Sequence, residues 1–407
     1  MINTYVARHA ILDASSNVIG YELLFRDGEN NSFPIGMCDE TATSKLLSQN
    51  HLTQDLDEVT QGKKAFINFT SETLIERFPR SLDPKLIVIE ILERADASAK
   101  LLFNIKKLKQ QGYTLALDDH DFDPKWQRFY PYIDIIKVDI QDFNVLQIAK
   151  FIKNLPQQNF TLLAERIETH EEFERFKMMG FSLFQGFYFS KPELVKGKDL
   201  ASNKLSLLQL LASASQPDIN IKDISQIVER DVALSYKLLR FVNSSGFAHQ
   251  QKISSLKQAL AYIGETELRK FISLLAMADL NDDKSNELLN MSMIRARFCD
   301  LVAQKSQGKV STQSAFLTGM FSLVDAMLDQ KMDSILAKIP ILDEIKSALT
   351  ERKGRLAACL HLTQHIEQGH WEQAEALSIK LGLNMQTTNE IFLASIKWAD
   401  TLQLQQE

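Results

Sequence analysis

Residues 113–139, YTLALDDHDFDPKWQRFYPYIDIIKVD, contain the pattern that decides the fold. Two short runs rich in aliphatic and aromatic residues, YTLALDD and YIDIIKVD, flank a loop that contains Pro124 and Trp126. Runs of this length and composition predict buried β-strands. The first run ends in Asp118 and Asp119, and the second carries Lys137 near its end. The stretch therefore predicts buried strands that finish in side chains able to bind a metal or a phosphate.

The same pattern extends over the first half of the chain. Further strand-like runs are VARHAIL, VIGYELLF, KAFINF, KLIVIEI, FTLLAE and SLFQGFYF. Between most of them lie segments such as SAKLLFNIKKLKQQG, whose apolar residues recur at three and four, as they do in amphipathic helices. Eight strands with helices between most of them predict a closed (β/α)8 barrel of the TIM type over residues 1–198.

The second half has a different pattern. After about residue 200 the strand-like runs nearly disappear, and segments such as LSLLQLLASAS and DISQIVERDVALSYKLLRFVNSS predict helices. The segment from Lys191 to Asn203 is the expected linker. A chain of 407 residues is longer than one core usually supports, which agrees with two domains. The predicted fold class is thus α/β followed by all-α, with a barrel at 1–198 and an all-helical domain at 199–407.

Composition excludes several classes of protein. Hydrophobic residues make up 45% of the chain and charged residues 24%, as in ordinary globular proteins. The net charge of −6, without a Lys/Arg block, argues against DNA or RNA as a partner. Three cysteines far apart predict reduced thiols in the cytoplasm. The start MINTYVARHAILDASS lacks the features of a signal peptide, and no run of about 18 apolar residues occurs, so we expect neither export nor membrane insertion.

Polar residues that can bind a metal or a phosphate fall at the ends of the predicted strands. They are Glu22, Asn68, Glu90, Asp118, Asp119, Lys137, Glu165 and Gln185. Each one alone is more simply explained as a turn or helix-capping residue. In an α/β barrel, however, the carboxyl ends of the strands meet at one mouth, which would bring these side chains together. So many carboxylates repel one another unless cations neutralise them, and oxygen ligands suit Mg²⁺, Mn²⁺ or Ca²⁺.

Such a mouth has a recognisable chemistry. Two divalent ions about 4 Å apart would clamp a phosphodiester and activate a water for in-line attack. Lys137 would add positive charge opposite the phosphate, and a remaining carboxylate would take the proton of the water. The sequence therefore predicts a phosphodiesterase site in outline.

Seven motifs carry a resemblance to a known family. They are YELLFR at 21–26, INFT at 67–70, IEILER at 89–94, ALDD at 116–119, IIKVD at 135–139, AERIET at 164–169 and FQGFYFSKPE at 184–193. In this order they resemble the EAL domains, which hydrolyse cyclic di-GMP, and in particular the branch in which an HDOD domain follows a modified EAL domain. The resemblance covers essentially the whole chain. It implies metal-dependent hydrolysis of cyclic di-GMP to linear pGpG.

The resemblance also implies a role for each site residue. The implied ligands of a pair of Mg²⁺ or Mn²⁺ ions are Glu22, Asn68, Glu90, Asp118 and Asp119. The residues implied in catalysis are Glu22, Lys137 on the attacking water or phosphate, and Glu165 as general base or outer-shell partner. The residues implied in binding the substrate are Arg26, Glu168 and Gln185. Glu93 corresponds to the glutamate that anchors the loop after the Asp pair.

Two segments depart from the family pattern. Active members follow the Asp pair with Phe-Gly-(Thr or Ala)-Gly-Tyr-Ser-Ser, whereas residues 120–126 read HDFDPKW and contain no glycine. Because glycine adopts positive φ readily, the loss of the two glycines is expected to alter the geometry of the loop and therefore the rate of turnover. Arg166 and Ile167 replace the Gly and Val of the usual Ala-Glu-Gly-Val-Glu, and Arg166 would either neutralise the metal site or contact phosphate. The alternative to a phosphodiesterase is a catalytically weak or inactive cyclic di-GMP receptor or scaffold that acts through protein–protein interaction.

Residues 199–407 resemble an HDOD domain, most clearly at DISQIVERDVALSYKLLRFVNSSGF. No His-Asp doublet occurs in this half of the sequence, so it shows no catalytic equipment. The resemblance implies a regulatory role with a protein partner, and control of motility and biofilm formation is typical of the family. The sequence leaves open which partner binds and whether the chain forms a homodimer.

Overall fold

The computed structural model describes residues 5–26, 56–75, 79, 82–156, 160–186, 188, 242, 256–280, 285–306, 310–339 and 341–403. The chain forms two compact units, one from Met1 to Phe189 and one that comprises most of the residues from Ser190 onward. The boundary predicted at 198/199 and the predicted linker lie outside the described residues.

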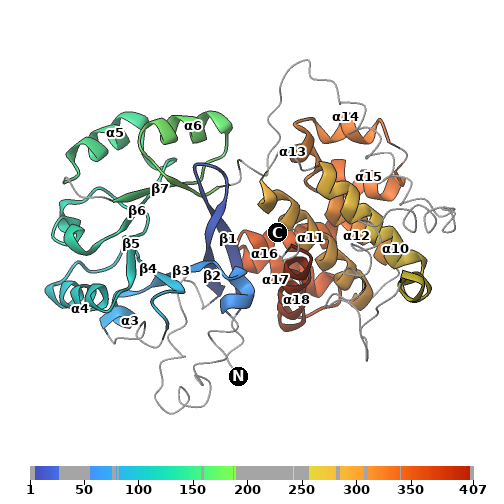
Figure 1. The fold of residues 1–407 in the computed structure, drawn as a ribbon, viewed down its shortest axis with the longest axis horizontal. Helices are drawn as coiled ribbons and strands as arrows, with labels where there is room; N and C mark the ends of the chain where they lie inside the picture. Colours follow the sequence, from blue (N-terminus) through green and yellow to red (C-terminus); the bar gives the residue numbers. More distant parts are fainter. Residues whose placement is uncertain are drawn as a thin grey trace, which may run out of the picture. The chain divides into compact units, whose positions relative to one another are not determined.

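Eight strands form a closed barrel in the first unit (Figure 1). They are β1 (Tyr5–Asp13), β2 (Val18–Arg26), β3 (Lys64–Phe69), β4 (Ile87–Ile91), β5 (Thr114–Leu117), β6 (Ile135–Asp139), β7 (Thr161–Glu165) and β8 (Leu183–Phe184). Each strand coincides with one of the predicted runs, and the predicted barrel is confirmed.

Strand β1 departs from the all-parallel arrangement of a regular (β/α)8 barrel. It runs antiparallel to both β2 and β8, whereas β2 to β8 pair with one another in parallel. The reason is local, because a tight turn between Asp13 and Val18 joins β1 to β2 where a parallel connection would need a crossover helix. The ladder between β1 and β8 contains two paired positions, Leu12 with Phe184 and Asp13 with Leu183.

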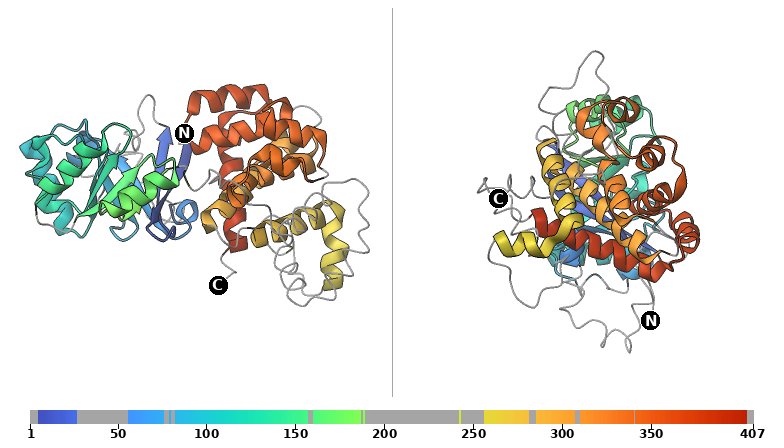
Figure 2. Two further views of the ribbon diagram at one scale, coloured as in Figure 1. Left: turned by 90° about the horizontal axis from the view of Figure 1, so that it is seen from above. Right: turned by 90° about the vertical axis from the view of Figure 1, so that its right-hand side faces the viewer.

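Helices connect most of the parallel strands and lie outside them (Figure 2). They are α3 (Ser71–Ile75), α4 (Ala99–Gln110), α5 (Val145–Asn154) and α6 (His170–Met178), while two 3-10 turns, η3 (Pro124–Trp126) and η4 (Tyr130–Tyr132), lie between β5 and β6. Ser98, Asn144 and Thr169 cap the three longer helices by accepting a hydrogen bond from the backbone N–H three residues on. These caps fix where each connection leaves the mouth of the barrel.

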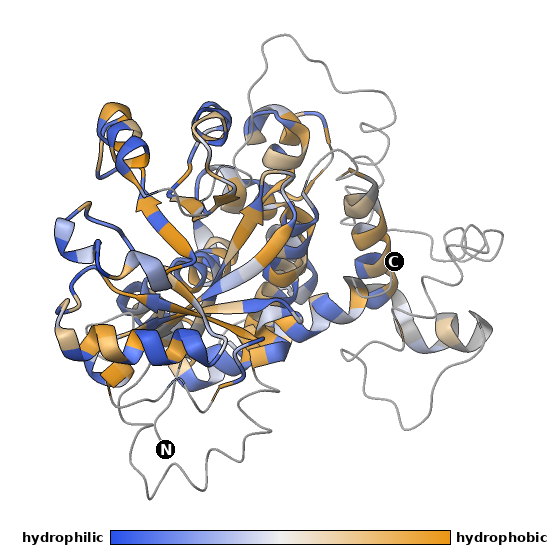
Figure 3. Cartoon of the chain, turned by 60° about the vertical axis from the view of Figure 1, so that its left-hand side comes forward, coloured by the Kyte–Doolittle hydropathy of each residue, from blue (hydrophilic) through white to orange (hydrophobic). Residues whose placement is uncertain are grey.

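The interior of the barrel is apolar, and most strand residues are coloured as hydrophobic in Figure 3. One core cluster is formed by Ile11, Phe66, Val88, Ala116, Ile135 and Leu163. Strands covered on both faces become nearly continuous apolar runs. The charged residues at their carboxyl ends are therefore exceptions within an apolar wall.

The second unit is all-helical wherever the structure describes it, as predicted. Its helices are α10 (Leu256–Leu280), α11 (Asn286–Lys305), α12 (Thr312–Phe321), α13 (Val324–Leu328), α14 (Met332–Leu336), α15 (Asp343–Thr350), α16 (Gly354–Glu367), α17 (Trp371–Lys380) and α18 (Met385–Gln403). Gly264, with φ of 66°, kinks α10. Among the described helices, none combines the length and apolar character needed to span a membrane.

A buried ion pair joins α10 to α11 in this unit. Nζ of Lys270 lies 2.8 Å from Oδ2 of Asp300, and the two side chains are 3% and 0% exposed. Arg297 Nη1 and Gln304 Nε2 donate to the same carboxylate at 2.9 and 3.1 Å. The Asp300 carboxylate thus has three donors in an apolar surrounding, which compensates for the loss of its hydration.

Candidate active site

The polar residues at the strand ends meet at one mouth of the barrel. The structure brings together Glu22 on β2, Asn68 on β3, Glu90 on β4, Asp118 directly after β5, Lys137 on β6, Glu165 on β7 and Gln185 directly after β8. The parallel register explains part of this arrangement, since Asn68 is the partner of Glu90 across β3 and β4.

Lys137 is the centre of this group. Its Nζ lies 2.5 Å from Oδ1 of Asp118, 2.7 Å from Oε1 of Glu90 and 3.0 Å from Oε1 of Glu165. Oε1 of Glu22 is 3.8 Å away, and the lysine side chain is 0% exposed. Burial alone would lower the pKa of Lys137, but the four carboxylates raise it well above its ordinary value. The lysine therefore stays charged, and one positive charge faces four acidic groups.

The excess of negative charge around Lys137, together with burial, shifts the pKa values of the acids. Burial, with repulsion from neighbouring carboxylates, raises the pKa of Glu90 and of Glu165 well above the ordinary value, although Lys137 opposes the shift. The same causes raise the pKa of Asp118 to about 6. Glu22 behaves differently: burial would raise its pKa, but Lys137 and the amide of Gln185 hold it below the ordinary value. Burial and mutual repulsion thus favour the protonated forms of Glu90, Asp118 and Glu165, whereas the contacts of Glu22 favour its charged form.

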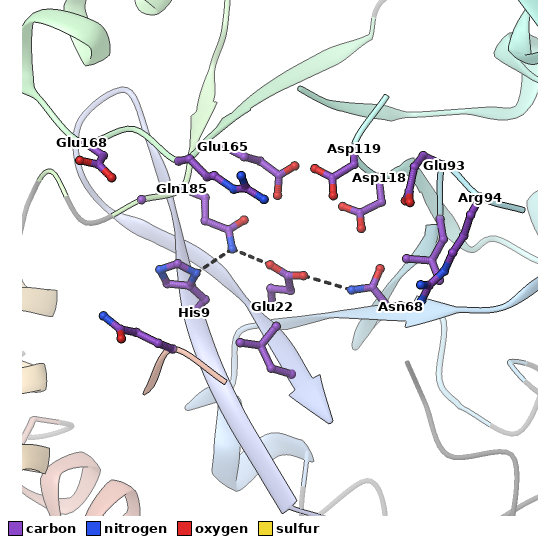
Figure 4. A pocket seen from close by; sticks show the side chains of 15 residues that line it. His9, Glu22, Asn68, Glu93, Arg94, Asp118, Asp119, Glu165, Glu168 and Gln185 are labelled. Atoms are coloured by element: carbon purple, nitrogen blue, oxygen red, sulfur yellow. Dashed lines mark hydrogen bonds between the residues drawn. The ribbon is translucent and has the colours of Figure 1, made fainter. Parts of the chain in front are cut away.

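Two amides fix the carboxylate of Glu22 (Figure 4). Asn68 Nδ2 donates to its Oε1 at 3.1 Å, and Gln185 Nε2 donates to its Oε2 at 2.5 Å. Gln185 Nε2 also lies 3.1 Å from Nδ1 of His9. Sequence reasoning missed His9, a single histidine within an apolar run. The signal that could have found it is the hairpin register, because His9 is the β1 partner of Glu22.

A cavity of about 500 Å³ opens above these groups, a size that suits a small-molecule ligand. Its lining includes most of the predicted site residues together with His9, Leu24, Leu92, Arg94, Arg166 and Gly186. Figure 4 shows Asp118, Asp119 and Glu165 on one side of Glu22 and Asn68, with Glu93 and Arg94 beyond Asp118.

The remaining predicted residues lie at the margin. Asp119 and Glu93 line the cavity, and Asp119 adopts a left-handed backbone with φ of 41°. Glu168 lines it as well, and its Oε1 accepts from Gln141 Nε2 at 3.4 Å. Arg26 ends β2, and its side chain lies outside the described residues.

The loop that replaces the glycine-containing segment holds itself in place. His120 Nε2 lies 3.0 Å from the Tyr130 hydroxyl, and His120 Nδ1 accepts from the Phe122 N–H at 2.9 Å. The carboxylate of Asp121 accepts from Lys125 Nζ at 2.9 Å and from Trp126 Nε1 at 3.1 Å. Phe122 adopts φ of 59° without being glycine. A residue keeps such a strained backbone only where its surroundings determine it, so this loop replaces flexible glycines with side-chain contacts.

Lys125 also links the loop to Glu93, the predicted anchor. Its Nζ donates to the backbone carbonyl of Glu93 at 3.3 Å. The contact that joins the loop to Glu93 is therefore made with the backbone carbonyl of this residue.

The donor chemistry of the mouth fits divalent metal ions. At the mouth, the buried oxygens without a hydrogen-bond partner in the described structure include Asn68 Oδ1, Glu90 Oε2, Glu165 Oε2 and Gln185 Oε1. Oxygen ligands of this kind suit Mg²⁺ and Mn²⁺, and the excess of acids supplies the charge that such ions neutralise. Within the described residues, no three His, Cys, Asp or Glu side chains are grouped as ligands of one ion. In this structure the acids contact the Lys137 ammonium instead.

Comparison with known proteins agrees with this architecture. The family model of the EAL domain matches residues 11–192, and that of the HDOD domain matches residues 200–339. Cyclic di-GMP phosphodiesterase CdgJ of Vibrio cholerae is 38% identical over 99% of this chain and 94% of its own length. The uncharacterized protein YuxH of Bacillus subtilis is 33% identical over 98% of this chain and 99% of its own.

Among solved structures, an EAL domain protein from Listeria monocytogenes is 19% identical, covering 46% of this chain and 87% of that chain with a TM-score of 0.35. The two family models match this chain in the order of domains that the seven motifs predicted. The chain therefore belongs to the family of proteins in which an HDOD domain follows an EAL domain.

Proposed function

We propose that the barrel is a metal-dependent phosphodiesterase that opens the ring of cyclic di-GMP to linear pGpG. The observation that carries the proposal is the convergence of Glu22, Glu90, Asp118 and Glu165 on Lys137 at the floor of an open cavity. The relative from Vibrio cholerae, which is named a cyclic di-GMP phosphodiesterase and matches almost the whole chain, supports the choice of substrate.

The ligands we propose for two Mg²⁺ or Mn²⁺ ions are Glu22, Asn68, Glu90, Asp118 and Asp119. Such ions, when bound, would withdraw charge from the phosphate and make an attacking water more acidic. Lys137 holds a fixed positive charge below the reacting phosphate. Its contacts with three acids orient them, so that they need not reorganise during the reaction.

Glu165 is the group that we propose takes the proton of the water. Its Oε1 pairs with Lys137, whereas its Oε2 is a buried acceptor without a hydrogen-bond partner in the described structure. Burial raises the pKa of this carboxyl well above its ordinary value, and a base is most effective when its pKa is near the working pH. We propose that Gln185, Glu168 and Arg26 contact the substrate.

For the helical half we propose a regulatory role through a protein partner, with the division between the two functions at 198/199. This half contains the buried Lys270–Asp300 ion pair, which joins α10 to α11. We also propose a cytoplasmic location, which the proposed substrate and the three separate cysteines support. Control of motility or biofilm formation through cyclic di-GMP, and a homodimer as the working form, belong to the same proposal.

The test is incubation of the purified full chain with cyclic di-GMP and Mg²⁺ or Mn²⁺, with pGpG measured by chromatography. We expect product from the wild type and none from Glu22→Ala or Glu165→Ala. Glu171→Gln is the matched control, since it removes an acid of the same unit that is 81% exposed on α6 and is not among the residues that line the cavity. This variant should retain the wild-type rate.

Absence of pGpG with either ion in excess would refute the phosphodiesterase. A calorimetric titration with cyclic di-GMP then distinguishes the alternative receptor, which binds without turnover, from a barrel that does not bind the dinucleotide.

A further inference from the structure

Arg166 occupies a backbone conformation that a large side chain adopts at a cost. It follows Glu165 at the end of β7 with φ of 55°, in the left-handed region where glycine is comfortable. Strain of this kind persists where surrounding structure imposes it, and it is concentrated at functional sites. The position therefore merits an explanation beyond a surface arginine.

Hydrogen bonds and close packing hold the backbone at Arg166 and Ile167 in place. The Ile167 N–H donates to the Gln185 carbonyl at 3.0 Å, and Gln141 Nε2 donates to the Arg166 carbonyl at 3.4 Å. Gly186 packs so closely on Ile167 that a Cβ there would lie 2.1 Å from the Ile167 oxygen. These backbone contacts thus fix the direction in which the Cα–Cβ bond of Arg166 points.

Arg166 forms an ion pair with one acid. Nε of Arg166 lies 2.9 Å from Oδ2 of Asp139, whose side chain is 2% exposed, while the arginine side chain is 59% exposed. The other oxygen of Asp139 accepts from the Gln141 N–H at 2.8 Å, which fixes the carboxylate. A guanidinium has five N–H donors, so pairing through Nε leaves donor capacity for a ligand. Arg166 lines the cavity above the acids.

Of the two roles open to this arginine, the geometry favours contact with phosphate over neutralisation of the acids. Glu165 is paired with Lys137 at 3.0 Å, whereas Arg166 is paired with Asp139. Among the described residues that line the cavity, the arginines are Arg94 and Arg166, and the acids are Glu22, Glu93, Asp118, Asp119, Glu165 and Glu168. A ligand with two phosphates needs a cation for the phosphate that lies away from the reacting centre.

We propose that Arg166 binds the phosphate of the cyclic dinucleotide that is not cleaved, and that Asp139 positions its guanidinium. The inference rests on the proposed phosphodiesterase function. It assigns Arg166 to substrate affinity and leaves the chemical step to the acids and Lys137. Guanidinium groups suit this task because they match the oxygens of a phosphate with two parallel donors.

The test compares Arg166→Gly with the wild type on two substrates. With cyclic di-GMP, KM should rise about tenfold while kcat stays within about twofold, because one charge-assisted contact to the ground state and transition state is lost equally. With bis(p-nitrophenyl) phosphate, which has one phosphate, kcat/KM should be unchanged. In the presence of EDTA, the dissociation constant for cyclic di-GMP should also rise about tenfold, which measures the contact without turnover.

Two further variants guard against a structural explanation. Arg352→Gly is the matched control, because Arg352 is an exposed arginine with nearly the same backbone, φ of 58°, outside the barrel. It should leave both KM values unchanged. Asp139→Asn should raise KM for cyclic di-GMP by a smaller factor in the wild type and should add nothing in Arg166→Gly, since its effect acts through the arginine.

The outcomes separate this inference from the function on which it rests. A wild type that cleaves cyclic di-GMP while Arg166→Gly keeps its KM and its dissociation constant overturns the role of Arg166 alone. Equal losses on both substrates overturn it as well, because they indicate damage to the reacting centre. A wild type that neither binds nor cleaves the dinucleotide overturns both proposals.

Discussion

Nζ of Lys137 and Oε1 of Glu90 lie 2.7 Å apart, and both side chains are 0% exposed. A pair this deeply buried is held by the mutual compensation of its charges rather than by solvent. Removing one partner leaves the other to lose its charge or to remain unpaired in an apolar wall. Lys137 therefore contributes to stability as well as to the proposed chemistry.

Lys137→Met should lower the free energy of unfolding by about 3–5 kcal/mol and abolish pGpG formation, since it leaves several buried carboxylates without their cation. Urea unfolding followed by circular dichroism measures the first effect. Lys109→Met is the control, because its pair with Asp134 is about one-third exposed and should contribute less than about 1 kcal/mol. Equal effects of the two variants would contradict the central role of Lys137.

Mn²⁺ should raise the Tm of the wild type, because ions that bind only the folded state stabilise it by about 2.7 kcal/mol at a concentration of 100 times Kd. A chelator should reverse the rise and stop product formation. Asn68→Ala removes a proposed ligand whose Oδ1 has no hydrogen-bond partner in the described structure, so its Tm should respond less to Mn²⁺. A response equal to that of the wild type would remove Asn68 from the ligand set.

Tyr130→Phe should destabilise the barrel by about 1–3 kcal/mol. The variant removes the hydroxyl that lies 3.0 Å from Nε2 of His120, and the buried imidazole of His120 then lacks this hydrogen-bond partner. The expected secondary effect is a fall in turnover, since the loop begins directly after Asp119. Tyr132→Phe, on the same 3-10 turn, serves as the control. Unchanged stability and unchanged turnover would show that the loop does not depend on this contact.

Asp300→Asn should destabilise the helical unit by about 3–5 kcal/mol, because Lys270 keeps its charge in a site where it is 3% exposed. Replacing both partners, in Lys270→Met with Asp300→Leu, should recover much of this loss. Thermal unfolding of the full chain provides the measurement. If the double variant is no more stable than Asp300→Asn, the buried pair is not the cause.

Asp325 should make the stability of the folded chain depend on pH, and the sign of this dependence follows from its raised pKa. Burial is the main reason that its pKa is raised in the folded chain. The folded state then binds the proton more tightly than the unfolded state, so the contribution of this group to stability is largest below the ordinary pKa and is lost as pH rises through the raised value. Asp325→Asn should therefore exceed the wild type in stability at pH 7, and the difference should shrink towards pH 4.

The control for this prediction is Asp343→Asn, which replaces an exposed acid in the first turn of α15. Denaturant midpoints measured across this pH range should differ from those of the wild type only for Asp325→Asn. Parallel pH profiles for the two variants would contradict the assignment.

The barrel and its mouth were accessible from sequence because the signal is simple. Strands buried on both faces must be apolar, so Glu90 in KLIVIEI and Lys137 in YIDIIKVD interrupt their runs for a reason other than packing. The closed topology then brings the strand ends together. The sequence pattern does not give the distances between these side chains, and only the structure shows that Lys137 lies between the acids.

Other features left little signal in the sequence. His9 lies in the middle of a strand, and the register of the hairpin places it opposite Glu22, where it also contacts Gln185. His120 was noted only as the first residue of the altered loop, yet the structure gives it a buried contact with Tyr130 that depends on how the loop folds back. Lys270 and Asp300 were not singled out, because charged residues in amphipathic helices usually face solvent.

The antiparallel strand β1 gives the mouth two unequal sides. It is attached to β8 by two paired positions but to β2 along nearly its whole length. Opening the β1–β8 seam should therefore break few ladder hydrogen bonds, as it should at β5–β6 and β7–β8, which also have two paired positions. His9 and Gln185 flank the β1–β8 seam, while Lys137 lies on β6, which pairs with β7 at five positions. The side of the mouth at His9 and Gln185 should thus open at less cost than the β6–β7 side, which carries Lys137 and Glu165.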